Sequence, residues 1–304
     1  MSDSIIRHGF KRASAGTGKT YWIVNDKLQE LHGQNKPFDK ILIVTFTEKA
    51  AGELRNRIRG MGFKDVNVDN MHIFTIHSFC QRVLKDFAVQ AGQPFELTLV
   101  DAGTDASFFV EKWIRDELPK NKYVFDLIKS NSDNLPKDIM KFATDLTKAI
   151  QTYTTSMEVE PPQEDEKNWY PNILSLTVKD LYMEWQKDKA ARKVQTYNDM
   201  ITSVHDAVVN NPSLLADLED RYVGAIIDEF QDTNQLQWDI FSRIFNNDKH
   251  FLYVVGDPKQ SIYAFQGADV NVYNNAIAGL EPIKSTEQSE DVPQWESARA
   301  ALSS

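Results

Sequence analysis

The chain has 304 residues, of which 41% are hydrophobic and 11% aromatic, so it can fold as one large or two moderate domains. Its single cysteine excludes an internal disulfide framework and fits a reducing compartment. No apolar stretch approaches the roughly 20 residues of a membrane helix. Met1–Arg12 lacks the apolar segment of a signal peptide. We therefore expect a cytoplasmic protein that has no membrane partner.

The formal net charge of −10 argues against a general nucleic-acid-binding surface, which would usually be basic. The charges are distributed unevenly, however. Acidic residues concentrate in Glu158–Glu166 and after Leu280, whereas residues 49–64 contain a basic cluster. Because one positive groove is enough to hold a single strand of DNA, the composition leaves nucleic-acid binding open.

The N-terminal part alternates short apolar runs with amphipathic helical patterns. The run Ile41–Val44 is apolar without alternation, as in a parallel strand that is buried on both faces. This β-α-β-α order predicts an α/β fold with a parallel sheet and helices on both faces. Strands are expected at Phe10–Ala13, Ile41–Val44 and His72–Thr75, and helices at about Lys19–His32, Glu48–Arg59 (ending at Gly60) and Ser78–Ala91.

The middle of the chain, from about Gln93 to Asn211, has mostly helical patterns and predicts a helical insertion with an exposed acidic loop at Met157–Asn168. Strands are expected again at Gly224–Asp228 and Phe251–Gly256. The loops of the insertion are expected to contain Pro119, Pro136, Pro161, Pro162 and Pro171. The predicted division is a first core part at 1–92, the insertion at 93–195, a second core part at 196–280, and a loose acidic tail at 281–304 with a short helix at Trp295–Leu302.

A glycine-rich segment follows the first predicted strand and opens the first predicted helix: Ala13-Ser14-Ala15-Gly16-Thr17-Gly18-Lys19-Thr20. Small residues let backbone N–H groups approach phosphate oxygens at the positive end of a helix. Lys19 would contact the β- and γ-phosphates, and the Thr20 hydroxyl would ligate Mg²⁺. The alternative is a glycine-rich turn without this role. The predicted nucleotide-binding residues are Ala15, Gly16, Thr17, Gly18, Lys19 and Thr20.

Two carboxylates follow the apolar run Ala225–Ile227, at the end of a strand where parallel sheets bind ligands. Asp228 would hold Mg²⁺ together with Thr20, directly or through a water molecule. Glu229 would orient and polarise the attacking water. The alternative is an ordinary acidic strand end before a turn.

A third segment, Val255–Asp269, places an amide side chain and several aromatic rings close behind a strand. Gln260 could sense the γ-phosphate while its neighbours contact another ligand. The alternative is a packed aromatic loop. The predicted catalytic residues are then Lys19, Asp228, Glu229 and Gln260.

These segments resemble the early motifs of superfamily 1 helicases of the UvrD/Rep type, and among them the RecB-like helicase subunits of ATP-dependent exodeoxyribonuclease V. The resemblance includes the alanine at residue 13 in place of the first glycine of the phosphate loop. The helical middle corresponds by position to the insertion called 1B in this family. Further segments resemble the two DNA-contacting motifs and the return to the core, in the same chain order: Thr45–Ala51 with Glu53–Ile58, Thr75–Cys80, and Thr196–Ile201.

The resemblance implies a RecA-like P-loop NTPase domain that binds ATP, Mg²⁺ and single-stranded DNA. It would belong to an ATP-dependent DNA helicase that acts in recombinational repair of double-strand breaks, with other subunits of a helicase–nuclease complex as further partners. The implied DNA-binding residues are Thr45, Phe46, Thr47, His77, Tyr263 and Phe265.

The residues by themselves leave two of these roles open. The resemblance makes Phe46 and Phe265 platforms on which unpaired bases stack, a contact worth about 1–3 kcal/mol per base. Without it, Phe46 would be a core residue after a buried strand and His77 a buried histidine. Arg55 and Arg57 are expected on a solvated helix face, outside the site.

Three departures from the family pattern limit what the resemblance implies. Gln266 stands where the third motif usually has arginine, and residues 1–12 contain no glutamine that could read adenine. The family's fourth motif is not found in Pro282–Ser304, and neither a second RecA-like domain nor a nuclease domain is found. We therefore expect the isolated chain to be a very weak ATPase without unwinding activity. The alternative is an inactive helicase domain that acts as an interaction module.

Overall fold

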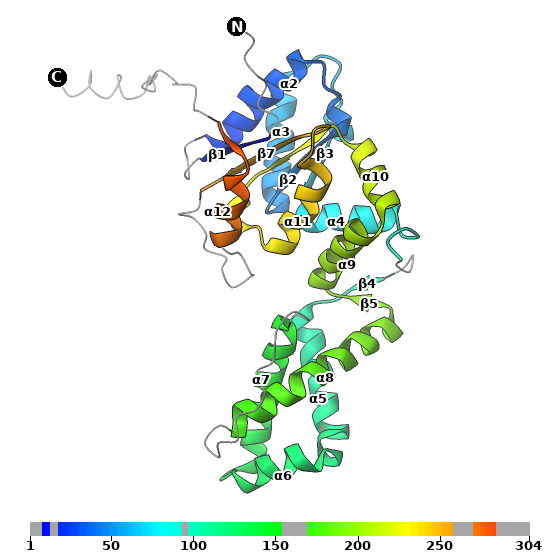
Figure 1. Ribbon diagram of the computed structural model, residues 1–304, viewed down its shortest axis with the longest axis vertical. Helices are drawn as coiled ribbons and strands as arrows, with labels where there is room; N and C mark the ends of the chain where they lie inside the picture. The colour runs from blue at the N-terminus through cyan, green and yellow to red at the C-terminus, as the bar shows by residue number, and fades with distance from the viewer. Residues whose placement is uncertain (1–7, 13–17, 93–96, 154–168, 258–269, 284–304) are drawn as a thin grey trace, which may run out of the picture. The chain divides into compact units, whose positions relative to one another are not determined.

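The computed structural model describes residues 8–12, 18–92, 97–153, 169–257 and 270–283. These residues include a six-stranded sheet with the order β3-β2-β6-β7-β1-β8 (Figure 1). Every neighbouring pair in it is parallel, which confirms the predicted parallel α/β sheet. The strands are β1 (His8–Arg12), β2 (Ile41–Thr45), β3 (His72–Thr75), β6 (Gly224–Ile227), β7 (Phe251–Gly256) and β8 (Glu281–Pro282).

Helices cover both faces of this sheet, which is why β2, β6 and β7 are buried along their whole length. On one face, Ile43 and Ile226 share a core with Leu28 and Leu54 from the covering helices. On the other face, Phe79 packs on Phe241 with ring centroids 5.4 Å apart. The first face carries α1 (Lys19–Tyr21), the π-helical η1 (Trp22–Leu28), α2 (Gln29–Gly33) and α3 (Glu48–Met61). The second carries α4 (Ile76–Asp86), α11 (Gln235–Phe245) and α12 (Val270–Ala278).

Several element ends differ from the predicted ones. Helix α3 runs through Gly60 to Met61, because glycine lowers helix stability without forbidding the helix. Helix α4 starts directly after β3, where the Thr75 hydroxyl accepts a hydrogen bond from the Ser78 N–H at 3.1 Å. The start of the predicted loose tail instead forms β8, and Ile283 N–H donates to the Phe10 carbonyl at 2.9 Å. The predicted helix at 295–302 lies outside the described residues.

The helical middle contains α5 (Ala102–Asp116), α6 (Lys122–Ser130), α7 (Leu135–Thr152) and α8 (Trp169–Arg192) around their own apolar core. Three of the prolines expected in loops, Pro119, Pro136 and Pro171, lie in the first turns of helical segments instead. Proline is tolerated there because the first N–H groups of a helix have no intrahelical partner. The acidic loop predicted at 157–168, with Pro161 and Pro162, lies outside the described residues.

A short parallel pair that the sequence did not predict joins β4 (Thr98–Leu99) to β5 (Val194–Gln195). The chain divides into two units, which we call the sheet unit (Met1–Phe79 with His205–Ser304) and the helical unit (Cys80–Val204). The divisions fall inside α4 and α9 (Tyr197–Asn210), and α10 (Pro212–Arg221) follows in the sheet unit. The domain boundaries at 92 and 195 stay predictions. Among the residues that the structure describes, no helix combines the length and apolar character needed to cross a membrane.

Candidate functional site

Lys19 opens the helical stretch that follows β1, at the carboxyl edge of the sheet. Gly18 precedes it with a φ of 85°, a conformation that glycine adopts without steric cost. The first N–H groups of a helix lack intrahelical partners and attract anions. Lys19 is buried and Thr20 half-buried at this helix start. The other predicted nucleotide-binding residues, Ala15, Gly16 and Thr17, lie outside the described residues.

The acidic pair Asp228–Glu229 follows β6 at the same edge. The Asp228 N–H donates to the Val44 carbonyl at 2.8 Å and so continues the pairing with β2 by one residue. Glu229 then adopts a φ of 53°, in the left-handed region, where a residue other than glycine costs about 1–3 kcal/mol. Such backbone strain clusters at functional sites because the surrounding structure must enforce it.

The ammonium group of Lys19 contacts the Glu229 carboxylate, although 210 residues separate them in sequence. In the sheet, β7 lies between β1 and β6, so this ion pair spans the end of β7. The lysine side chain is almost completely buried and the glutamate side chain is 32% exposed. The structure therefore brings together two of the predicted catalytic motifs. The remaining catalytic candidate, Gln260, belongs to the third motif and lies outside the described residues.

The surroundings at this edge disfavour the charged form of two carboxylates, Asp228 and Asp232. Burial, followed by the charge of Glu229, raises the pKa of Asp228 to about 6. The same two causes raise the pKa of Asp232 to about 6. Asp232 Oδ1 is buried and has no hydrogen-bond partner among the described residues. Carboxylates perturbed in this way are more frequent at functional sites than elsewhere.

Gln231 connects the ends of β6 and β7, a role that the sequence analysis did not assign to it. Its Nε2 donates to Glu229 Oε2 at 2.7 Å, and its Oε1 accepts from the Asp257 N–H at 3.0 Å. The side chain is 3% exposed. Its position inside the predicted acidic motif is visible in the sequence, but its partner after β7 is not.

The ends of β2 and β3 carry the residues that the resemblance assigns to DNA. Thr45 is buried and donates to the Thr47 carbonyl at 3.1 Å, while exposed Thr47 caps α3 by accepting from the Ala50 N–H at 3.1 Å. Phe46, between them, is half-buried rather than part of the core. Their DNA contacts stay predictions. Two other candidates, Tyr263 and Phe265, lie outside the described residues.

Helix α4 begins beside this edge. His77 is half-buried, and burial lowers its pKa, so the imidazole is mainly neutral at pH 7. Glu48 accepts hydrogen bonds from Thr75 Oγ1 at 3.0 Å and from Ser78 Oγ at 2.6 Å, and so links the two segments that resemble DNA-contacting motifs. This link was not predicted, because it depends on how β2 and β3 are aligned.

One expectation about the neighbouring basic residues was wrong. Arg55 does not lie on a fully solvated face: it is half-buried and donates to the Ile73 carbonyl of β3. Arg57 is exposed, as expected. The guanidinium of Arg55 reaches inward because α3 packs along β3.

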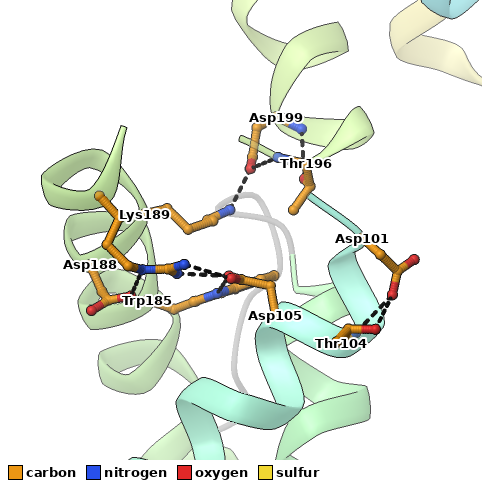
Figure 2. A network of polar contacts seen from close by, with 9 residues as sticks. Asp101, Thr104, Asp105, Trp185, Asp188, Lys189, Thr196 and Asp199 are labelled. Carbon is orange, nitrogen blue, oxygen red and sulfur yellow. Dashed lines mark hydrogen bonds and ion pairs between the residues drawn. The ribbon is translucent and has the colours of Figure 1, made fainter. Parts of the chain in front are cut away.

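The segment Thr196–Ile201 opens α9 in the helical unit and belongs to a network of polar contacts (Figure 2). The Thr196 N–H donates to Asp199 Oδ2 at 2.7 Å, and the Asp199 N–H donates to Thr196 Oγ1 at 3.2 Å. Lys189 from α8 donates to the same Asp199 oxygen at 2.5 Å. The segment thus caps α9 and ties its first turn to α8.

Asp105 forms the other half of this network, between α5 and α8. It accepts from Trp185 Nε1 at 2.8 Å and from both terminal nitrogens of Arg192 at 2.8 and 3.0 Å. Arg192 also donates to Asp188 at 2.7 Å. All of these groups are paired with one another, so we interpret the network as one that stabilises the helical unit and not as a binding site.

The donor set at the sheet edge fits Mg²⁺ bound together with a nucleotide. Among the described residues, no three His, Cys, Asp or Glu side chains converge as a self-sufficient metal site would need. Mg²⁺ is usually held by one or two carboxylates together with phosphate oxygens and water. Asp228 and the Thr20 hydroxyl are ligands of that kind.

Several known proteins are similar to this chain over most of its length. The chain is 26% identical to the RecBCD enzyme subunit RecB of Mycobacterium tuberculosis (strain CDC 1551 / Oshkosh), over 96% of this chain and 28% of that protein. It is 26% identical to DNA helicase II of Escherichia coli (strain K12), over 90% of this chain and 35% of that protein. It is 28% identical to a probable DNA helicase II homolog of Rickettsia felis, over 90% of this chain and 38% of that protein.

The chain thus spans only about a third of the length of these curated relatives. Residues 11–280 match the family model described as the UvrD/REP helicase N-terminal domain. The match covers Lys19 and Glu229, the helical unit and the ends of β2 and β3. The chain belongs to the UvrD/REP helicase N-terminal domain family.

Proposed function

We propose that this chain is the ATP-binding and single-stranded-DNA-binding motor domain of an ATP-dependent DNA helicase of the UvrD/RecB type. The observation that carries the proposal is the contact between Lys19 and Glu229 across the end of β7. It places a cation suited to phosphate oxygens next to a carboxylate suited to holding a water molecule. The family membership supports the same assignment.

In this proposal each residue has one task. The Lys19 ammonium contacts the β- and γ-phosphates of ATP, and the N–H groups at the helix start bind phosphate oxygens. Asp228 and Thr20 hold Mg²⁺, which neutralises charge on the phosphates when bound. Glu229 orients the attacking water, and Gln260 remains the predicted sensor of the γ-phosphate.

The DNA part of the proposal rests on the neighbouring strand ends. Thr45 ends β2, Phe46 and Thr47 follow it, and His77 follows β3, at the same edge of the sheet as Lys19. A half-buried aromatic ring can stack on bases of any sequence. Tyr263 and Phe265 remain further candidates. We also propose that the chain binds other protein subunits, as the name RecBCD enzyme subunit indicates for one relative.

Calorimetry with Mg-ATP tests the nucleotide site. Lys19→Ala should weaken binding by about 1.5–3 kcal/mol, because it removes a charge-assisted phosphate contact. Lys36→Ala, which removes an exposed lysine of the same unit, is the matched control and should bind like the wild type. Equal affinity of the wild type and Lys19→Ala would contradict the proposal and favour an interaction module.

Fluorescence anisotropy with labelled oligonucleotides tests the DNA site. Single strands should bind better than duplex, with affinity that falls as salt rises. Phe46→Ala should weaken binding to all sequences about equally, whereas Phe108→Ala, which removes an exposed ring of the helical unit, should not. Equal competition by single-stranded and duplex DNA would show that base stacking is not the binding mode.

A further inference from the structure

The Gln231 side chain connects the acidic motif to the end of β7. It lies in the single-turn η6 (Phe230–Asp232), directly after the strained residue Glu229. Its Nε2 donates to Glu229 Oε2 at 2.7 Å and to Asp232 Oδ2 at 3.3 Å. Its Oε1 accepts from the Asp257 N–H at 3.0 Å. One buried amide therefore fixes the Glu229 carboxylate relative to the residue that follows β7.

Gly256, the last residue of β7, makes room for this amide. A Cβ atom at this position would lie 2.6 Å from Gln231 Oε1 and 3.2 Å from the backbone nitrogens of Gln231 and Phe230. Carbon and oxygen atoms that are not bonded to each other do not approach to 2.6 Å. The absence of a side chain at Gly256 is thus a condition for the hydrogen bond between Gln231 and Asp257.

Glu229 receives hydrogen bonds from two donors of different character, and both contact Oε2. Lys19 is one of them, but its ammonium is also the group proposed to contact the phosphates of ATP. Gln231 is tied to a backbone N–H instead, so its contact with Glu229 does not compete with the nucleotide. As a neutral amide it also leaves the negative charge of Glu229 in place.

We propose that Gln231 is a positioning residue that holds the Glu229 carboxylate against the carboxyl end of β7 in the orientation needed for water attack on ATP. The inference rests on the proposed function, which assigns the attacking water to Glu229. Gln231 does not contact the reacting atoms itself. Because it acts on orientation, its loss should slow hydrolysis while nucleotide binding persists.

The test compares Gln231→Ala and Gln231→Glu with the wild-type chain. Mg-ATP binding is measured by calorimetry, and hydrolysis by single turnover with the chain in excess over radiolabelled ATP and followed for hours. Binding should stay within about twofold, because Lys19, Thr20 and Asp228 are intact. The hydrolysis rate should fall at least about tenfold, since small misplacements of a catalytic group are costly.

The two variants separate the donor from the acceptor. Gln231→Glu keeps an oxygen for the Asp257 N–H but replaces the donor to Glu229 with a second negative charge, so it should be at least as slow as Gln231→Ala. Gln235→Ala, which removes an exposed glutamine of α11, is the matched control and should hydrolyse ATP like the wild type. A purely structural role of Gln231 would instead lower binding, hydrolysis and thermal stability together, and would overturn the proposal.

A double-mutant cycle with Gly256→Ala gives an independent readout. Gly256→Ala alone should slow hydrolysis by displacing the Gln231 amide, and should slow it much less when Gln231 is already alanine. Additive effects would overturn the proposal, and so would a wild-type rate in Gln231→Ala. A wild-type chain that does not bind Mg-ATP, or hydrolyses it no faster than Glu229→Gln, would overturn the proposed function and this inference with it.

Discussion

Asp232 in the sheet unit and Asp105 in the helical unit are equally buried, each 9% exposed, yet their pKa values move in opposite directions. Burial by itself would raise the pKa of Asp105, but hydrogen bonds from Arg192 and Trp185 outweigh burial and lower it. Burial and then the charge of Glu229 both raise the pKa of Asp232, which reaches about 6.

The difference lies in the partners and not in the depth of burial. Asp105 completes a closed set of hydrogen bonds that ties α5 to α8, as Figure 2 shows. Asp232 lies near the charged Glu229 carboxylate, and one of its oxygens has no partner among the described residues. A protein that keeps such an arrangement gives up stability, which is typical of sites that bind or transform a ligand. The comparison therefore separates a structural cluster from a functional one.

The largest effect is expected at the structural cluster. Asp105→Ala should lower the free energy of unfolding by about 3–4 kcal/mol, because it leaves the Trp185 N–H and the Arg192 guanidinium without their partner. Asp116→Ala on the same helix removes an exposed carboxylate paired with Arg115 and should have no measurable effect. Urea denaturation followed by circular dichroism measures both. A loss below 1 kcal/mol (about the value of a surface pair) for Asp105→Ala would mean that the cluster is not a structural tie.

The same substitution at both positions should have effects of opposite sign. Asp105→Asn removes the charge that Arg192 pairs with and should lower the free energy of unfolding by about 2 kcal/mol. Asp232→Asn removes repulsion from Glu229 and should raise it by about 1 kcal/mol. Urea denaturation of the two variants under identical conditions measures both changes in the free energy of unfolding. Destabilisation of similar size at both positions would remove the distinction between the two clusters.

Much of the sheet could be predicted from the sequence, because it depends on local patterns. The run Phe251–Gly256 is a strand with the predicted bounds, and Ile41–Val44 extends by one residue to Thr45. Strands that are buried on both faces have no alternation, and their order with helices fixes a parallel sheet. Since the carboxyl ends of parallel strands meet at one edge, the sequence also predicted that the segments of Lys19 and Glu229 lie at the same site.

The polar links could not be predicted, because they join residues that no local pattern connects. Trp185 and Asp105 are 80 residues apart, and Gln231 reaches Asp257 across 26 positions. The pair β4–β5 is equally remote in sequence, and each of its strands is too short to give a period-two pattern. The prediction that Arg55 lies on a solvated face failed for the same reason, because its partner is the Ile73 carbonyl of β3.

The pH dependence of stability should reproduce the contrast between the two carboxylates. The raised folded pKa of Asp232 means that the wild type loses stability relative to Asp232→Asn as the pH rises from the ordinary value of 3.8 through about 6. The difference between the two should grow by about 1–2 kcal/mol over this range and be constant below it. For Asp105, whose pKa is lowered, the stabilising contribution is complete above 3.8 and is lost only at lower pH.

Unfolding curves recorded from pH 3 to pH 7 in the presence of EDTA measure these differences. The comparison of Asp105→Asn with the wild type should therefore be flat across the range in which the comparison for Asp232→Asn changes. A flat profile for both would show that burial and the charge of Glu229 do not raise the pKa of Asp232 in solution.

The smallest effect is expected at Thr47, where substitution distinguishes a local structural role from a proposed DNA contact. Thr47 caps α3 in the sheet unit, and Asn134 caps α7 in the helical unit by accepting from the Lys137 N–H. Capping is local, so Thr47→Ala and Asn134→Ala should each cost about 1 kcal/mol of stability. Only Thr47 is also a predicted contact to the DNA backbone.

Thr47→Ala should therefore weaken binding of single-stranded DNA, whereas Asn134→Ala should leave it unchanged despite a similar loss of stability. Thr47→Ser keeps the hydroxyl and should preserve both the cap and the DNA affinity. Anisotropy and denaturation measured on the same three variants separate the two roles, because loss of stability by itself would affect both alanine variants alike. Unchanged DNA affinity in Thr47→Ala would mean that its hydroxyl serves only the helix. The contrast between the two units would then rest on the carboxylates alone.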